Sequence, residues 1–259
     1  MMDALVHHRI SHPYHLSTHL LDIQQLNESA INAQYDVSKI SAATLPLIEN
    51  TYQLLESGAA MGFGVGPILV SKYKLSAEKL TNCTIGIPGQ NTTAHYLFRH
   101  FFPEANHKKY MLFSEIESAI LDGRLDAGVL IHEGRFTYQS KGLQLIYDLG
   151  ALWESTYQLP IPLGILVAKK SLGQSSIAII DRMISESIQY AFDHPDASGD
   201  YVLQHSQEMS PEVTRQHIQL YVNKYSVNMG TNGHQALDFL LGKIPSETSK
   251  QLKAHPHVD

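Results

Sequence analysis

His132 is the residue of this chain whose type and position first suggest a functional site. It follows residues 127–131, a short apolar run bounded by glycine and charge, which predicts a buried strand of an α/β sheet. Ligands of open α/β sheets collect outside the carboxyl ends of the strands, so His132 and the neighbouring Glu133 and Arg135 are placed to meet a small molecule. The alternative is that His132 only hydrogen-bonds to backbone, because histidines of intermediate burial are ordinary.

Lys39 and Ser41 lie at the end of a second predicted strand, residues 35–41. Polar side chains at such a strand end are suited to ligand binding. Ser41 or Thr44 is also available to cap a helix that we expect over residues 45–55. A capping serine and a surface lysine are therefore the alternative to a binding site.

Thr92 and Thr93 lie at the amino end of a predicted amphipathic helix, residues 92–101, which follows a predicted strand at residues 84–88. Free backbone N–H groups and two hydroxyls make this helix end a suitable seat for an anionic or hydroxylated ligand. The alternative is simple N-capping, which needs only one of the two threonines. We expect both to contact ligand as well as to cap the helix.

The amino-terminal segment is crowded with histidines: His7, His8, His12, His15 and His19. Two pairs among them have the four-residue separation with which a helix can chelate a metal ion. Pro13, however, interrupts any helix there. Metal sites normally need three or four converging ligands, so we interpret these histidines as solvated surface and predict no metal site.

Composition narrows the class of protein. With 259 residues, 43% of them hydrophobic, the chain can bury a large core. The formal net charge of −6 and scattered basic residues argue against nucleic-acid binding and favour a small-molecule partner. One cysteine, Cys83, allows no intrachain disulfide and no multi-cysteine metal site. The sequence contains neither a run of ~20 apolar residues nor a secretory pattern, so we expect a cytoplasmic protein that does not enter the membrane. Its oligomeric state stays open.

A glycine-rich segment, residues 57–67, leads into an apolar strand at residues 68–72. A dinucleotide-binding fingerprint would have to precede a helix, so we reject that interpretation. Such a segment favours a backbone crossing between two lobes, where close packing and unusual dihedral angles are needed. A second apolar run, residues 160–170, has a similar pattern and suggests that the two strands form a paired hinge.

The pattern divides the chain into two α/β lobes. The first lobe comprises residues 1–76 and 159–259, and residues 77–158 form an inserted second lobe. Two crossings with a ligand cleft between α/β lobes describe the type II periplasmic-binding-protein architecture.

The remaining elements are expected from periodicity and capping. We predict helices at residues 22–33, 114–123 (opened by a capping box at Ser114), 176–192, 201–209 and 210–225, and strands at residues 16–23, 109–113 and 143–149.

Four runs of residues carry a resemblance to a known family: residues 36–41, 57–67, 131–138 and 160–164. They resemble the 1,4-dihydroxy-6-naphthoate synthases of the futalosine route to menaquinone, over nearly the whole chain. The run His-Glu-x-Arg-Phe-Thr-Tyr separates this family from the chorismate dehydratases, which share the fold. The resemblance implies a lyase that splits cyclic dehypoxanthine futalosine into 1,4-dihydroxy-6-naphthoate and a three-carbon fragment without a cofactor.

The resemblance also implies roles for single residues. His132 matches the proton acceptor of the family, and we expect it to act as general base. The substrate-contacting segments of the family match residues in two places, Lys39, Ile40 and Ser41 in one and Thr92 and Thr93 in the other. A solute-binding protein without catalysis and a chorismate dehydratase-like enzyme are the alternatives with the same fold.

The amino terminus departs from the family pattern. Members usually open with a strand and a Ser-x-Cys-Pro-Asn-Asp-Thr run just ahead of the segment that corresponds to residues 1–8. Residues 1–6 also read as the interior of a helix without an N-cap. We therefore expect a chain that begins late and lacks one strand at the sheet edge.

Overall fold

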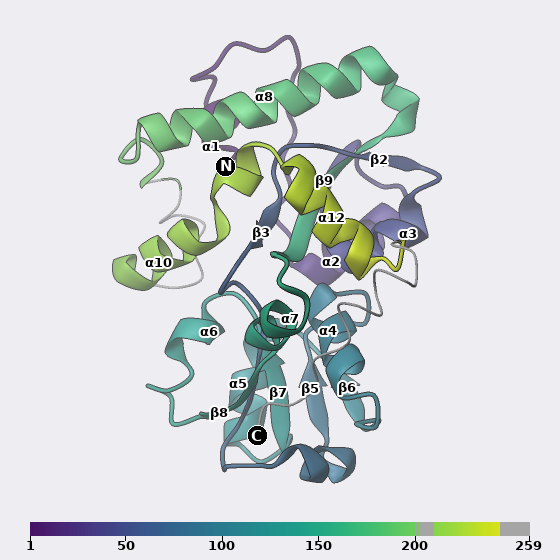
Figure 1. The fold of residues 1–259 in the computed structure, drawn as a ribbon. Helices are drawn as coiled ribbons and strands as arrows, with labels where there is room; N and C mark the ends of the chain where they lie inside the picture. Colours follow the sequence, from purple (N-terminus) through teal and green to yellow (C-terminus); the bar gives the residue numbers. More distant parts are fainter. Residues whose placement is uncertain (200, 202–209, 244–259) are drawn as a thin grey trace.

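The computed structural model describes residues 1–199, 201 and 210–243 and contains two β-sheets, one in each lobe (Figure 1). The first sheet is organised around the long strand β9 (Ile161–Lys169), which is antiparallel to each of its partners. These partners are β1 (Val37–Ser41), β2 (Tyr52–Leu54) and β3 (Ala60–Gly62). β9 is buried along most of its length because strands and helices cover it on all sides.

The second sheet has five strands in the order β6-β5-β7-β4-β8. Their bounds are β4 (Ile68–Ser71), β5 (Ile85–Ile87), β6 (Lys108–Tyr110), β7 (Ala127–Leu130) and β8 (Gln144–Asp148). β5 is parallel to β6 and β7, whereas β4 is antiparallel to β7 and β8. The sheet therefore combines a parallel α/β unit with one strand that enters from the other lobe.

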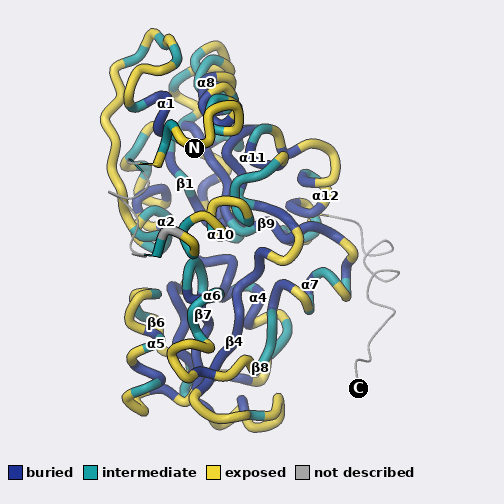
Figure 2. Tube along the Cα trace, turned by 90° about the vertical axis from the view of Figure 1, so that its left-hand side faces the viewer, coloured by how far each residue is buried: buried dark blue, intermediate teal, exposed yellow. Residues whose placement is uncertain are grey.

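Helices cover both sheets (Figures 1 and 2). With the first sheet lie α1 (Asp3–Val6), α2 (Ile23–Ile31), α3 (Leu45–Ile48), α8 (Gln174–Asp193), α10 (Pro211–Tyr221), α11 (Lys224–Val227) and α12 (Gly230–Leu240). With the second sheet lie α4 (Thr93–Phe101), α5 (Phe113–Leu121), α6 (Gly134–Thr137) and α7 (Leu149–Tyr157). Short 3-10 turns occupy Ala42–Thr44, Ala77–Asn82 and Lys170–Leu172. No helix among the described residues is long and apolar enough to cross a membrane.

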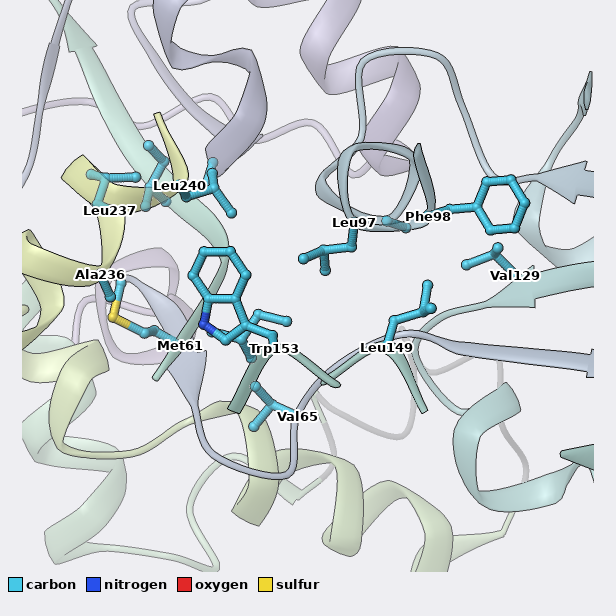
Figure 3. Packing of buried hydrophobic residues seen from close by; sticks show 14 of the residues in the cluster. Met61, Val65, Leu97, Phe98, Val129, Leu149, Trp153, Ala236, Leu237 and Leu240 are labelled. Atoms are coloured by element: carbon cyan, nitrogen blue, oxygen red, sulfur yellow. The ribbon is translucent and has the colours of Figure 1, made fainter. Parts of the chain in front are cut away.

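The largest apolar core continues from one lobe into the other (Figure 3). Trp153 of α7 is 1% exposed, and its ring lies against Phe239 of α12. Met61 of β3 in the first lobe and Leu97 of α4 in the second lobe belong to the same cluster. The two lobes therefore share buried apolar surface where they meet.

Two glycines allow the chain to cross between the lobes. A Cβ on Gly66 would lie 2.2 Å from the Cα of Gly150, and one on Gly150 would lie 2.6 Å from the Cα of Gly66. Only glycine permits backbones to approach this closely. β4 pairs within the second sheet, so the chain enters that sheet between Gly62 and Ile68, earlier than the expected boundary at residue 76. The expected paired hinge is wrong, because β4 and β9 lie in different sheets.

Other expectations differ in detail. The helix expected at residues 45–55 ends at Ile48, and residues 52–54 form β2 against β9, because a short apolar run fits either type of element. Neither Ser41 nor Thr44 caps that helix through its side chain.

The start of α2 and the start of α5 also differ from expectation. The strand expected at residues 16–23 is absent, and Asp22 instead forms a capping box with Gln25 at the start of α2. α5 begins at Phe113 after Leu112, so Ser114 lies inside the first turn and does not cap it. The helix expected at 201–209 lies outside the described residues apart from residue 201.

Candidate active site

A cavity of about 850 Å³ lies between the lobes. It is lined from the first lobe by Lys39, Ser41, His217 and Tyr221, and from the second by Thr92, Thr93, His132 and Glu133, among others. The structure thus brings together the expected site residues Lys39, Ser41, Thr92, Thr93, His132 and Glu133, whereas Ile40 and Arg135 do not line the cavity. Ile40 is fully buried in the core.

His132 follows β7 in a left-handed backbone conformation, with φ of 54°. This conformation costs a non-glycine residue ~1–2 kcal/mol and is tolerated best by Asn and Asp besides glycine. It turns the chain sharply from β7 into α6. The imidazole packs edge-on against Phe113, with ring centroids 5.0 Å apart. The strained turn therefore holds the ring at the cavity wall.

Burial determines the charge state of His132. It lowers the pKa of the imidazole to about 4, while the carboxylate of Asp22 acts in the opposite direction. The ring is therefore neutral at pH 7 and keeps one nitrogen lone pair for a proton.

Lys39 of β1 is one of the residues that line the cavity. Its Nζ donates a hydrogen bond to the carbonyl of Gly58, and burial lowers its pKa to about 8. The backbone of Gly164 leaves room for this side chain, because a Cβ there would lie 3.2 Å from the Lys39 Cε. At pH 7 the site accordingly contains a partly desolvated cation.

Ser41 is held by a buried asparagine that the sequence analysis missed. The Oδ1 of Asn27 on α2 accepts from the Ser41 N–H at 2.8 Å, and its Nδ2 donates to the Ser41 Oγ at 3.0 Å and to the Asn91 carbonyl at 3.2 Å. Asn27 stands four residues after Ile23 and three before Ala30. Asn27 therefore lies on the same helix face as these apolar residues. A polar residue on such a face is the signal that could have identified Asn27 from the sequence.

The two threonines have different partners. The Thr92 Oγ1 accepts from the His95 N–H at 3.1 Å, which confirms that Thr92 caps α4, and donates to the Gly89 carbonyl at 2.9 Å. The Thr93 Oγ1 donates to the Leu163 carbonyl of β9 at 2.8 Å and accepts from the Ala43 N–H at 3.2 Å.

These internal bonds leave limited capacity for a ligand. Each hydroxyl already donates its hydrogen and keeps one lone pair as a free acceptor. The first N–H groups of α4, at Thr93 and Ala94, have no intrahelical partner, and both residues line the cavity. This helix end is therefore the more suitable donor to an anionic group.

Arg135 differs from expectation. Its guanidinium donates to the Asp148 carboxylate at 2.6 Å and to the Gly66 carbonyl at 2.8 Å, and the side chain does not line the cavity. The Asp148 side chain also accepts from the Ala151 N–H at the start of α7. Arg135 therefore fastens the segment after His132 to the crossing between the lobes.

His217 and Tyr221, one helical turn apart on α10, are further cavity residues that the sequence analysis missed. The His217 ring lies 5.9 Å from that of His132 and 4.6 Å from that of Tyr221. Burial is the main reason that the pKa of His217 falls to about 4 and that of Tyr221 rises to about 12. The sequence signal that could have identified them is a His and a Tyr four residues apart, and hence on one face of a predicted helix.

The histidine-rich amino terminus forms no comparable site. The rings of His8 and His12 stack 4.9 Å apart, and His7 pairs with the buried Asp3 at 2.6 Å. No group of three or more His, Cys, Asp or Glu among the described residues is arranged to hold a metal ion.

Comparisons with known proteins identify the family. A family model described as menaquinone biosynthesis matches residues 1–245. The 1,4-dihydroxy-6-naphthoate synthase of Streptomyces coelicolor is 38% identical over 252 residues, which cover 95% of this chain and 89% of the relative. The enzyme of the same name from Thermus thermophilus is 36% identical over 234 residues, which cover 90% of this chain and 85% of the relative.

Solved structures agree with the expected fold. A protein of Archaeoglobus fulgidus, 33% identical, superposes with a TM-score of 0.88 over 96% of this chain and 91% of its own. An alkanesulfonate-binding protein of Xanthomonas axonopodis pv. citri, 13% identical, superposes with a TM-score of 0.62 over 90% of this chain and 81% of its own. The latter shows the fold alone, and it confirms the two-lobed binding-protein architecture. The chain belongs to the menaquinone-biosynthesis family and is an enzyme related to the 1,4-dihydroxy-6-naphthoate synthases.

Proposed function

We propose that this enzyme is a carbon–carbon lyase that converts cyclic dehypoxanthine futalosine into 1,4-dihydroxy-6-naphthoate, with His132 as its general base. The observation that carries the proposal is a neutral imidazole at the end of β7, on the wall of a cavity of about 850 Å³, in a chain 38% identical to a synthase of that name. The cavity is within the range of small-molecule sites, about 300–1,000 Å³.

His132 is suited to accept a proton. Cleavage of a carbon–carbon bond with aromatisation begins with the loss of a proton from a substrate hydroxyl or carbon, and a positioned base contributes ~10²–10⁴-fold. With its pKa near 4, the ring is unprotonated at neutral pH, although it is then a weak base. A substrate carboxylate bound nearby would raise that pKa and strengthen the base.

Groups from both lobes are placed to hold an acidic, hydroxylated substrate. Lys39, Thr93 and Ala94 line the cavity, and the Lys39 ammonium group and the first N–H groups of α4 are the donors that they offer. Ser41 lines the cavity at the end of β1, and Ile40 precedes it in the same strand. We propose Lys39, Ile40, Ser41, Thr92 and Thr93 as the substrate-binding residues.

The test is incubation of the purified chain with cyclic dehypoxanthine futalosine, followed by chromatographic detection of 1,4-dihydroxy-6-naphthoate and of a three-carbon fragment. Parallel incubation with chorismate tests the dehydratase alternative. Unchanged substrate that nevertheless binds tightly would contradict the proposal and favour a solute-binding protein. We also propose a cytoplasmic location, on the basis of the relatives' role in biosynthesis, which cell fractionation would test.

A further inference from the structure

We propose that His217 is a second catalytic residue of this site, and that its Nε2 donates a hydrogen bond to the substrate oxygen that becomes negatively charged when His132 removes a proton. This inference rests on the proposed function. It gives a role to a histidine that no motif in the sequence singles out.

The first reason is an unsatisfied polar atom. The Nε2 of His217 is buried and has no hydrogen-bond partner among the described residues. A buried polar atom without a partner is costly, so such atoms in native proteins call for an explanation. The residue lines the cavity, so a ligand oxygen that reaches Nε2 from that cavity would supply the partner.

The second reason is the position of His217 relative to His132. The two ring centroids are 5.9 Å apart, with the planes tilted by 54°. A substrate in the cavity can therefore contact both imidazoles. His132 follows a strand of the second sheet, whereas His217 comes from α10, which packs against β3 of the first sheet. α10 and α6 lie next to each other where the lobes meet (Figures 1 and 2).

The third reason is the charge state of the pair. Burial and the neighbouring His132 lower the pKa of His217 to about 4, while Glu133 acts in the opposite direction. When His132 takes the proton, its positive charge keeps His217 neutral. A neutral imidazole with its hydrogen on Nε2 can donate to an oxyanion without losing that proton, as neutral histidine electrophiles do in other enzymes. One proton thus moves to His132, and the charge left on the substrate meets the His217 N–H.

The variants that test this inference are His217→Phe and His217→Gln. The Phe variant keeps a ring beside Tyr221 and removes Nε2, whereas the Gln variant keeps a donor close to the Nε2 position. We expect His217→Phe to lower kcat by about 10²-fold or more with a smaller change in KM, as for other oxyanion donors, and His217→Gln to recover at least a tenth of wild-type kcat. His234→Phe, on α12 and outside the cavity, is the matched control and should keep wild-type kcat.

A second measurement follows ligand binding in the wild-type chain and needs no activity from the variants. In protein with ¹⁵N-labelled histidine rings, addition of 1,4-dihydroxy-6-naphthoate should shift the His217 ring resonances, which are assigned by their loss in His217→Gln. Wild-type kcat in His217→Phe, equal losses in the Phe and Gln variants, or unshifted His217 resonances would each overturn the inference. If the wild type itself forms no naphthoate, the proposed function fails, and that result is distinct from these.

Discussion

Removal of the Asn27 side chain should damage both the fold and substrate binding. Asn27 is fully buried and makes three hydrogen bonds, two with Ser41 and one with the Asn91 carbonyl. In Asn27→Ala the buried N–H of Ser41 loses its acceptor, while the Asn91 carbonyl keeps the Thr44 hydroxyl as a donor at 2.7 Å. One unsatisfied buried N–H, the other lost bonds and a small cavity together cost about 2–4 kcal/mol.

For a chain of this size that loss corresponds to a fall in Tm of about 5–15 °C. Because Ser41 would no longer be fixed at the cavity wall, we also expect KM to rise several-fold. The assays are thermal unfolding and steady-state kinetics. Asn32→Ala is the matched control, because Asn32 is exposed at the end of the same helix and bonds only to the Glu28 carbonyl. A Tm within about 2 °C of wild type for Asn27→Ala, with KM unchanged, would refute the reasoning.

Further predictions concern three other residues. Binding of the anionic product, measured by titration calorimetry, should weaken as pH rises through about 8, because Lys39 loses its proton there. Lys39→Met should abolish this pH dependence, whereas Lys74→Met, a change at an exposed lysine, should leave it intact. In the unfolded chain Lys39 keeps its proton to about pH 10.4. Between about pH 8 and about pH 10.4 the unfolded state therefore binds more protons than the folded state, so the free energy of unfolding should rise with pH, which urea titration would detect. Thr93→Val should lower the free energy of unfolding by about 1–3 kcal/mol, because two partly buried backbone groups lose their partner, whereas Thr93→Ser should not. Gly150→Ala should lower Tm more than Thr93→Val does, because the new Cβ would lie 2.6 Å from the Cα of Gly66. An unchanged Tm would contradict the close approach of the two backbones.

Much of the fold was predictable because local patterns agree with it. The apolar run that became β7 is bounded by glycine and charge, as buried strands are, and the glycines before β4 allow the close backbone approach of a crossing, so the position of His132 and the crossing followed from them. The helix expected at 45–55 was wrong because a short apolar run satisfies both helical and strand periods, and pairing with β9 decided the outcome.

The site was predictable only where an element ends. Ser41, Thr92 and His132 lie at such ends, and their presence on the cavity wall followed from this position, whereas Lys39 lies in the middle of β1. Asn27 and His217 lie within helices, and the direction in which a helix turns its polar residue depends on tertiary packing. A single sequence does not contain that information.

The most direct test of the central claim compares wild type with His132→Asn in a single-turnover reaction with cyclic dehypoxanthine futalosine. Asparagine tolerates the left-handed backbone at residue 132, so the variant should keep its Tm and bind the substrate. We expect wild type to form 1,4-dihydroxy-6-naphthoate and the variant to form it at least 10²-fold more slowly, because the general base is gone. Equal rates of product formation, or no product from wild type, would contradict the account.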